Sequence, residues 1–305
     1  MRLLNASGCL DALTAPEVAN ELDAFVTKTI TPLPREGNAP VRIAETELGM
    51  LNAIGLANPG MEEFSRQTLP RLARTVDEIW VSVGGFSSDD YALLCAAIDG
   101  CDEVAAVELN LSCPNVDEVP ESIGEVVAAA RAATTKPLYA KLSPAVPDVA
   151  ETVRAAEAAG ADGLSLVNTI RGLALDERTL RPVLDRGAGG LSGPALRPIA
   201  LAAVQACRRA TALPIVGMGG VMTGRHALEL LAAGANDVAL GTVLFRDPAA
   251  PGRIQAELEA ELAAHGFADA DNAIGAAHGS DLPTLHQRSR VSVEKRLHTG
   301  LNVAG

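Results

Sequence analysis

The sequence predicts an α/β protein in which eight parallel strands close into a (β/α)8 barrel, the TIM-barrel architecture, as a single domain. Short apolar strand patterns alternate with longer helical patterns along the chain, and the strand pattern occurs eight times in 305 residues. Alternating strands and helices are typical of a parallel sheet covered by crossover helices. Eight such units in a chain of this length favour closure of the sheet into a barrel.

The predicted strands are short runs of β-branched and other apolar residues. In chain order they cover residues 2–8, 24–31, 79–85, 104–112, 137–144, 163–169, 214–220 and 237–242. Helical patterns lie between them, and the clearest cover residues 121–133, 148–160, 193–210 and 224–234. Two of these helices end in the similar sequences AAGAD and AAGAN, whose glycine is the expected C-cap. An open doubly wound sheet ranks below the barrel, because no GxGxxG follows the first strand.

The composition excludes several classes of protein. Hydrophobic residues make up 48% of the chain, which is enough for a large core, although aromatic residues make up only 3%. With 25 Lys and Arg against 38 Asp and Glu, the net charge of −13 argues against non-specific nucleic-acid binding, which needs a basic face. An anionic small molecule remains compatible with this charge, because a pocket can be locally positive.

Targeting signals and cysteine patterns point to a cytoplasmic protein. The sequence has no apolar run of the about 18 residues that a membrane span needs, and no N-terminal apolar segment typical of a signal peptide. Its 5 cysteines are scattered without a CxxC pair. The sequence therefore predicts neither a disulfide framework nor a metal or iron–sulfur cluster in this chain, and a reducing cytoplasm is the expected compartment.

The alternation of strands and helices stops near Gly275. We therefore predict a barrel over residues 1–274 and a C-terminal extension over residues 275–305. The extension has a local net charge of +2, from Arg288, Arg290, Lys295 and Arg296 against Asp281 and Glu294. We interpret it as a surface extension or a partly disordered tail, and a specific docking role is the alternative.

In barrels of this kind the chemistry takes place at the carboxyl ends of the strands. The polar and small residues at the predicted strand ends are Ser7, Lys28, Asn110, Cys113, Asn115, Lys141, Asn168, Thr169, Gly219, Gly220, Gly241 and Thr242. All 5 histidines lie in predicted helices or in the C-terminal part, so neither a histidine base nor a metal site is expected. Two lysines and one cysteine remain as titratable candidates.

Lys28 and Lys141 lie in apolar strands at positions that alternate toward the barrel interior. A buried ammonium needs an electron-rich partner, because burying it unpaired is very costly. Either lysine alone could extend its charged end to the rim of the barrel. Two lysines on different strands instead favour a shared anionic ligand.

Glycine-containing turns follow the seventh and eighth predicted strands, with GMGG at 217–220 and ALGT at 239–242. These positions match the usual phosphate site of a barrel, where loop N–H groups hold the anion. Tight turns would explain either motif alone, whereas both together favour the phosphate of a cofactor. A phosphate and two lysines in a polar pocket suggest FMN, because positive charge near the flavin stabilises its reduced anion.

Short segments of the sequence resemble class 1 dihydroorotate dehydrogenases. They are ASGC (6–9), TKTIT (27–31), PREGN (34–38), GMLNAIGLANPG (49–60), ELNLSCPNV (108–116), KLSP (141–144), VNT (167–169), GGLSGPA (189–195), GMGGV (217–221) and GT (241–242), in family order. The forms GMLNAIGL, KLSP and GGLSGPA are closest to the B-type, whose catalytic chain works with a separate electron-transfer subunit.

The resemblance implies contacts for an FMN cofactor and for the substrate. FMN contacts are implied at Ser7, Lys28, Thr29, Asn110, Lys141, Val167, Gly193, Gly219, Gly220, Gly241 and Thr242. Dihydroorotate or orotate contacts are implied at Lys28, Asn52, Ile54, Gly55, Leu56, Asn110, Asn115, Asn168 and Thr169. Asparagine amides suit this substrate, because they both donate to and accept from the amide edges of its ring.

Cys113 is implied to be the catalytic base, which removes a proton from C5 of dihydroorotate while hydride leaves C6 for the flavin N5. Thiol chemistry agrees with this role, because a thiol in a dry pocket can be tuned toward thiolate. A small buried hydrophobe is the usual role of a cysteine. Its position after a strand, before Pro114 and between Asn110 and Asn115, favours catalysis. The loop over residues 116–125 is expected to cover the substrate.

The sequence is thus identified as a member of a family of flavoprotein oxidoreductases that oxidise dihydroorotate to orotate in de novo pyrimidine biosynthesis. We expect a homodimer, and the resemblance to the B-type implies a partner subunit that carries FAD and an iron–sulfur cluster. The chain has no GxGxxG after a strand, so it is not expected to use NAD by itself. Direct transfer to fumarate, as in the A-type, is the alternative.

Three alternative functions remain open. Another FMN-dependent pyrimidine reductase, similar to the pyrimidine-reducing domain of dihydropyrimidine dehydrogenase, would usually carry histidine after SCP, where this chain has Asn115. A non-redox phosphate-binding barrel, such as an aldolase or isomerase that uses Lys141, would contain no flavin. An inactive barrel is the third alternative.

Overall fold

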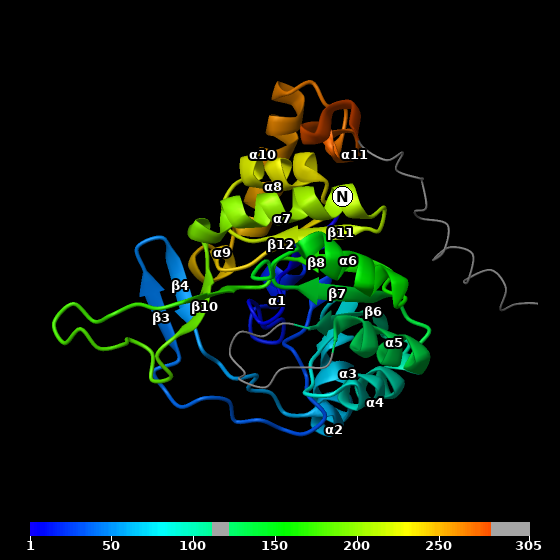
Figure 1. The fold of residues 1–305 in the computed structure, drawn as a ribbon, viewed down its shortest axis with the longest axis vertical. Helices are drawn as coiled ribbons and strands as arrows, with labels where there is room; N and C mark the ends of the chain where they lie inside the picture. Colours follow the sequence, from blue (N-terminus) through cyan, green and yellow to red (C-terminus); the bar gives the residue numbers. More distant parts are fainter. Residues whose placement is uncertain (112–121, 282–305) are drawn as a thin grey trace, which may run out of the picture.

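The computed structural model describes residues 1–111 and 122–281, which form an eight-stranded parallel barrel with a small second sheet beside it (Figure 1). The strand order in the barrel is β1-β12-β11-β8-β7-β6-β5-β2. The strands are β1 (Leu3–Asn5), β2 (Phe25–Val26), β5 (Ile79–Val83), β6 (Val104–Asn110), β7 (Leu138–Leu142), β8 (Gly163–Leu166), β11 (Ile215–Met218) and β12 (Asp237–Leu240). The predicted barrel class is confirmed, and each of these strands lies within one of the eight predicted ranges.

Side chains as well as backbone close the barrel between β1 and β2. Leu4 and Ala24 form a parallel bridge. The Asn5 side-chain amide donates to the Val26 C=O and accepts from the Val26 N–H, both at 2.8 Å. Asn5 is fully buried, and β2 is only two residues long. The Asn5 amide therefore supplies hydrogen bonds that a longer β2 would form with the backbone of β1.

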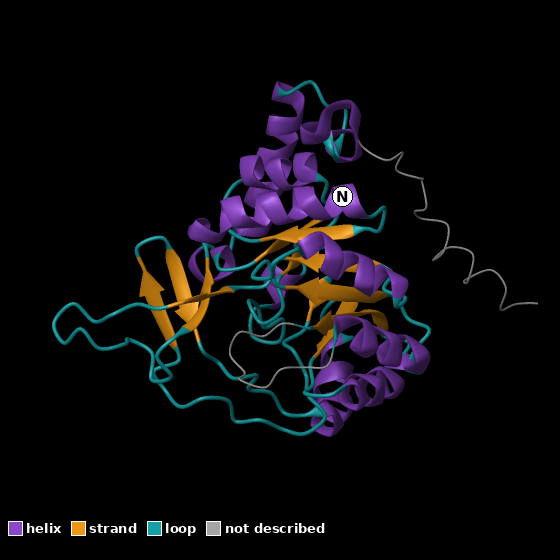
Figure 2. Ribbon diagram, in the orientation of Figure 1, coloured by secondary structure: helices purple, strands orange, loops and turns teal. Residues whose placement is uncertain are grey.

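Helices cover the outside of the barrel (Figure 2). The longer ones in the described part of the chain are α4 (Ser88–Asp99), α5 (Ile123–Ala133), α6 (Val149–Ala158), α7 (Arg197–Ala210), α8 (Gly224–Ala233) and α10 (Ala250–Ala264). The shorter ones are α1 (Pro16–Ala19), α2 (Met61–Glu63), α3 (Leu69–Leu72), α9 (Val243–Arg246) and α11 (Ala270–Ala273). Gly234 is the C-cap of α8 with φ of 116°, as predicted, whereas Gly160, with φ of 102°, follows the C-cap residue Ala159 of α6.

A charged and aromatic stack fills the amino-terminal end of the barrel interior. The Arg2 guanidinium lies 5.0 Å from the Trp80 ring centre and forms ion pairs with Asp237 at 2.8 Å and Glu78 at 3.0 Å. The Trp80 and Tyr139 rings are 4.4 Å apart between centres. This packing closes one end of the interior and leaves the carboxyl ends of the strands for a site.

A small antiparallel sheet beside the barrel is a feature that the sequence patterns do not predict. Its strands are β3 (Ile43–Thr46), β4 (Gly49–Asn52), β10 (Gly189–Ser192) and β9 (Ile170–Gly172), in the order β3-β4-β10-β9. Figure 1 shows β3, β4 and β10 of this sheet to the left of the barrel. Its two halves come from distant parts of the chain, so neither half reveals the pairing on its own.

The first residues of the predicted C-terminal extension pack against α8. The Gly275 N–H donates to the Leu231 C=O at 2.9 Å, and the His278 Nε2 lies 2.7 Å from the Ala233 C=O. Residues 282–305, including the basic residues of the extension, lie outside the described residues, so the boundary after residue 274 stays a prediction. In the part of the chain that the structure describes, no helix is long and apolar enough to cross a bilayer.

Replacing Arg208 with methionine is expected to destabilise the barrel by about 3 kcal/mol, because several buried acceptors lose their donor. Arg208 is fully buried, and burial lowers its pKa to about 10, which still leaves it charged at neutral pH. Its guanidinium donates to the C=O groups of Gly234, Thr211 and Leu213 and to the Asn236 side chain, at 2.7 to 3.1 Å. These bonds tie the ends of α7 and α8 to the start of β11.

Urea unfolding followed by circular dichroism measures this effect. The matched control is Arg209→Met, the same substitution at the next residue, whose side chain is exposed. Equal unfolding midpoints for the two variants would contradict the structural role of Arg208.

Candidate active site

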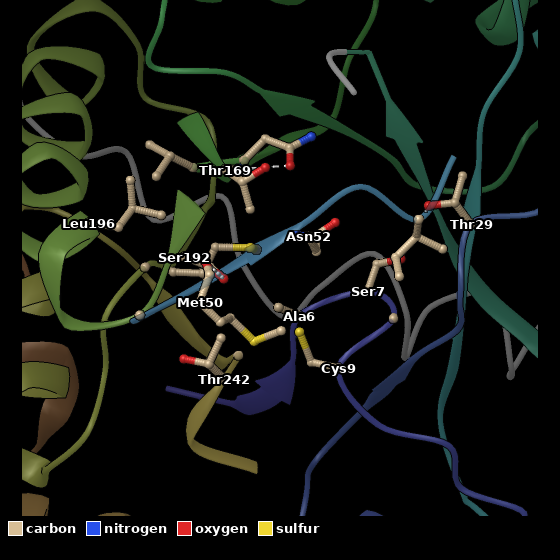
Figure 3. Close-up of a pocket in the computed structure, with 18 of the residues that line it drawn as sticks. Ala6, Ser7, Cys9, Thr29, Met50, Asn52, Thr169, Ser192, Leu196 and Thr242 are labelled. Atoms are coloured by element: carbon tan, nitrogen blue, oxygen red, sulfur yellow. Dashed lines mark hydrogen bonds between the residues drawn. The ribbon is translucent and has the colours of Figure 1, made fainter. Parts of the chain in front are cut away.

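A pocket opens at the carboxyl ends of the barrel strands, where they meet the small sheet (Figure 3). Its cavity volume is about 200 Å³, and the empty space within it, counted together with open solvent at the mouth, is about 1150 Å³. Barrel residues form its floor and one side, and Met50, Asn52 and Ser192 of the small sheet form part of the other.

The structure brings the predicted site residues of the described chain together in this pocket. Its wall contains every residue implied to contact FMN: Ser7, Lys28, Thr29, Asn110, Lys141, Val167, Gly193, Gly219, Gly220, Gly241 and Thr242. It also contains the residues implied to contact substrate at Lys28, Asn52, Ile54, Gly55, Leu56, Asn110, Asn168 and Thr169. Cys113, Asn115 and the first part of the loop expected to cover the substrate lie outside the described residues.

A chain of hydrogen bonds at the base of the pocket connects residues of β5 and β6 with the segments that follow β2 and β8. The Thr29 hydroxyl lies 3.1 Å from the Ser82 hydroxyl and accepts from the Asn110 amide at 3.1 Å. The Asn168 amide donates to Asn110 Oδ1 at 3.0 Å and accepts from the Thr169 N–H at 2.8 Å. These bonds set the orientation of both asparagine amides.

Lys141 reaches the pocket from β7 and forms a buried ion pair behind the pocket wall. Its Nζ lies 3.4 Å from the Glu108 Oε1, and the two side chains are 7% and 2% exposed. Sequence reasoning predicts that Lys141 needs an electron-rich partner but does not find Glu108. Glu108 is missed because the strand register pairs Lys141 with Asn110, and not with Glu108, on β6.

The backbone of the loops after β1, β10 and β11 approaches the pocket closely. Gly8 has φ of 78°, and a Cβ at this position would lie 2.9 Å from the Lys28 Cδ. The Lys28 side chain therefore packs directly against the Gly8 backbone. Gly220 has φ of 74°, and its Cβ would lie 2.9 Å from the Gly193 C=O. Larger residues at either position would be strained and would crowd the pocket.

The pocket also contains residues that sequence reasoning does not assign: Ala6, Gly8, Cys9, Ile43, Met50, Ser192, Leu196, Met218, Val221 and Phe245. Most lie inside or beside motifs that carry the family resemblance, which is the signal that could have found them. Ile43 and Phe245 lie in no such motif and reach the pocket from β3 and from α9. Burial raises the pKa of the Cys9 thiol, against the opposing charges of Lys141 and Lys28.

Comparisons with known proteins agree on one family. A family model described as dihydroorotate dehydrogenase matches residues 2–262. The protein named dihydroorotate dehydrogenase B (NAD(+)), catalytic subunit, of Desulforudis audaxviator is 46% identical over 264 residues, which cover 84% of this chain and 86% of that protein. The protein of the same name from Geobacter sulfurreducens is 46% identical over 262 residues, with the same coverage of 84% and 86%. The crystal structure of DHODH from Eimeria tenella in complex with ferulenol has a TM-score of 0.74 at 23% identity, covers 91% of this chain and 85% of that chain, and supports the fold alone.

Proposed function

The chain belongs to the dihydroorotate dehydrogenase family and oxidises dihydroorotate to orotate, a step of pyrimidine biosynthesis, and we propose that it does so with FMN as the catalytic subunit of a B-type enzyme. The observation that carries the finer proposal is the composition of the pocket. Two lysines, a hydrogen-bonded set of asparagines and the glycine turns of two strand ends meet there. These groups suit a phosphate, a flavin ring and an orotate ring.

The residues of the pocket fit the two ends of FMN. The phosphate would be held where bare backbone reaches the pocket, at Gly193, Gly219, Gly220, Gly241 and Thr242. The flavin ring would be held by Ser7, Lys28, Thr29, Asn110, Lys141 and Val167. When bound, FMN supplies the hydride acceptor of the reaction. Lys141 supplies positive charge, which favours a reduced, anionic ring.

The remaining groups suit dihydroorotate, which offers amide edges and a carboxylate. Asn110 and Asn168 are oriented by their hydrogen bonds, so their amides are in place before the substrate arrives. Lys28 supplies a positive charge for the carboxylate. Further contacts are proposed at Asn52, Ile54, Gly55, Leu56 and Thr169, all of which line the pocket. A contact is also proposed at Asn115, outside the described residues.

We assign removal of the C5 proton to Cys113. The assignment rests on the resemblance of ELNLSCPNV to the family motif and on the ability of a tuned thiol to act as a base. Cys9 lines the same pocket, but burial raises the pKa of its thiol. A thiol that stays protonated is a poor base, so Cys9 is the weaker candidate.

Electrons are proposed to leave through a partner subunit that carries FAD and an iron–sulfur cluster, because the sequence has no GxGxxG for NAD. A second copy of the chain is proposed to cover the apolar side chains around the small sheet. Val41, Leu48 and Leu173 are 54%, 61% and 58% exposed there, and exposed apolar groups that cluster often mark interfaces.

The scattered cysteines support a cytoplasmic location.

The isolated chain is expected to oxidise dihydroorotate with an artificial dye as acceptor and to reduce no NAD. The measurement is anaerobic steady-state turnover of the purified, yellow protein with dye, NAD or fumarate, and dihydrouracil serves as the control substrate. Rapid NAD reduction without a partner would contradict the B-type proposal, and fumarate turnover at the dye rate would indicate the A-type. Preference for dihydrouracil would favour another pyrimidine reductase, and a colourless protein would favour an aldolase or isomerase.

A further inference from the structure

We propose that Glu108 is a positioning residue that lowers the reduction potential of the bound flavin by acting through Lys141. The inference rests on the proposed assignment of FMN to the pocket. The family resemblance implies no ligand contact at Glu108. From its place in the structure, Glu108 cannot touch the substrate.

Glu108 lies behind the pocket wall. It is 1% exposed and does not line the pocket, whereas Lys141 does. Its Oε1 lies 3.4 Å from the Lys141 Nζ, and both side chains are buried. Any effect of Glu108 on the contents of the pocket must therefore pass through the ammonium of Lys141.

The groups beside this pair in the sheet carry no charge. Ser82 is the register partner of Glu108 on β5, and Ser165 is the register partner of Lys141 on β8. Both serines are buried, and the Ser165 hydroxyl has no hydrogen-bond partner among the described residues. Within the described chain, Glu108 is the carboxylate that forms an ion pair with Lys141.

The sign of the effect follows from the charges. A lysine alone would favour a reduced, negatively charged ring over the oxidised, neutral ring. The Glu108 carboxylate cancels much of that preference, because the pair as a whole is neutral. Loss of the carboxylate should therefore stabilise the reduced form relative to the oxidised form and raise the potential.

The size of the effect can be bounded from similar interactions. A charge within about 4–6 Å shifts a proton equilibrium by roughly one to three powers of ten in a protein interior. Glu108 lies behind the Lys141 ammonium and so further from the proposed ring position. We therefore use the lower end of this range, one power of ten. We expect Glu108→Gln to shift the reduction equilibrium about tenfold toward the reduced flavin, which is about 30 mV for a two-electron couple.

The experiment compares the reduction potential of bound flavin in four proteins, each equilibrated anaerobically with a reference dye. They are the wild type, Glu108→Gln, Glu108→Asp and Glu78→Gln. Glu108→Asp keeps the charge on a shorter side chain, so its potential should fall between those of the wild type and Glu108→Gln. Glu78→Gln is the matched control, because it removes one carboxylate at the opposite end of the barrel interior, where Glu78 pairs with Arg2.

A potential of Glu108→Gln equal to that of the wild type would overturn the proposal, and so would an equal shift in Glu78→Gln. If Glu108→Gln does not fold, Glu108→Asp decides: a positive shift supports the proposal, and the wild-type value overturns it. A wild-type chain that binds no flavin would overturn the assignment of FMN itself, and this inference with it. If Glu108 had a purely structural role, its variants would change the stability of the protein, but their flavin potentials would not rise in the order wild type, Glu108→Asp, Glu108→Gln.

Discussion

Cys113→Ala is expected to bind FMN as the wild type does and to reduce it with dihydroorotate about 10²-fold more slowly, or worse. General-base catalysis contributes about 10² to 10⁴ in rate, and alanine removes the base without adding a new charge. The proton at C5 would then have no positioned acceptor. Stopped-flow absorbance of the flavin under anaerobic conditions measures the rate directly.

Two further variants make this result specific. Cys9→Ala is the matched control, because it removes the other thiol of the pocket, whose pKa is raised by burial. It should reduce its flavin at nearly the wild-type rate. Cys113→Ser should recover part of the activity at higher pH only, because a hydroxyl is a weaker acid than a thiol. Flavin reduction by Cys113→Ala at the wild-type rate would show that another group is the base.

Lys141→Met is expected to lower the reduction potential of the flavin and to destabilise the protein by about 3 kcal/mol or more. The stability loss arises because Glu108 would keep a buried charge without its partner, and removing one partner of a buried pair costs about 3–5 kcal/mol. The potential falls because the reduced ring loses its counter-charge. Urea unfolding and dye equilibration measure the two effects separately.

The double variant Lys141→Met with Glu108→Gln tests this explanation. It removes both charges of the pair, so much of the stability lost in Lys141→Met should return, as expected for residues that interact directly. Stability that stays as low as in the single variant would mean that Lys141 acts by packing rather than by its charge. An unchanged flavin potential in Lys141→Met would place its ammonium away from the ring.

The barrel could be predicted because its information is local in the chain. Each strand appears as a short apolar run, and each connection as a helical pattern with recognisable ends, such as the glycines at 160 and 234. In a closed parallel barrel the carboxyl ends of all strands meet on one face. That geometry is why Lys28, Asn110 and Lys141 could be placed in one pocket from the sequence.

Other features depend on pairing between distant segments of the chain, so they can be seen only in the folded protein. Asn52 reaches the pocket because β4 pairs with β10 in a small sheet whose two halves lie far apart in the chain. Glu108 and Asn110 are both polar residues at alternate positions of β6. The sequence pattern does not show that Asn110 lines the pocket and that Glu108 lies behind its wall. The strand and helix patterns were enough to predict the barrel and the strand ends that carry the chemistry. The structure decided which neighbouring charges surround them, because an ion pair across two strands depends on side-chain reach as well as register.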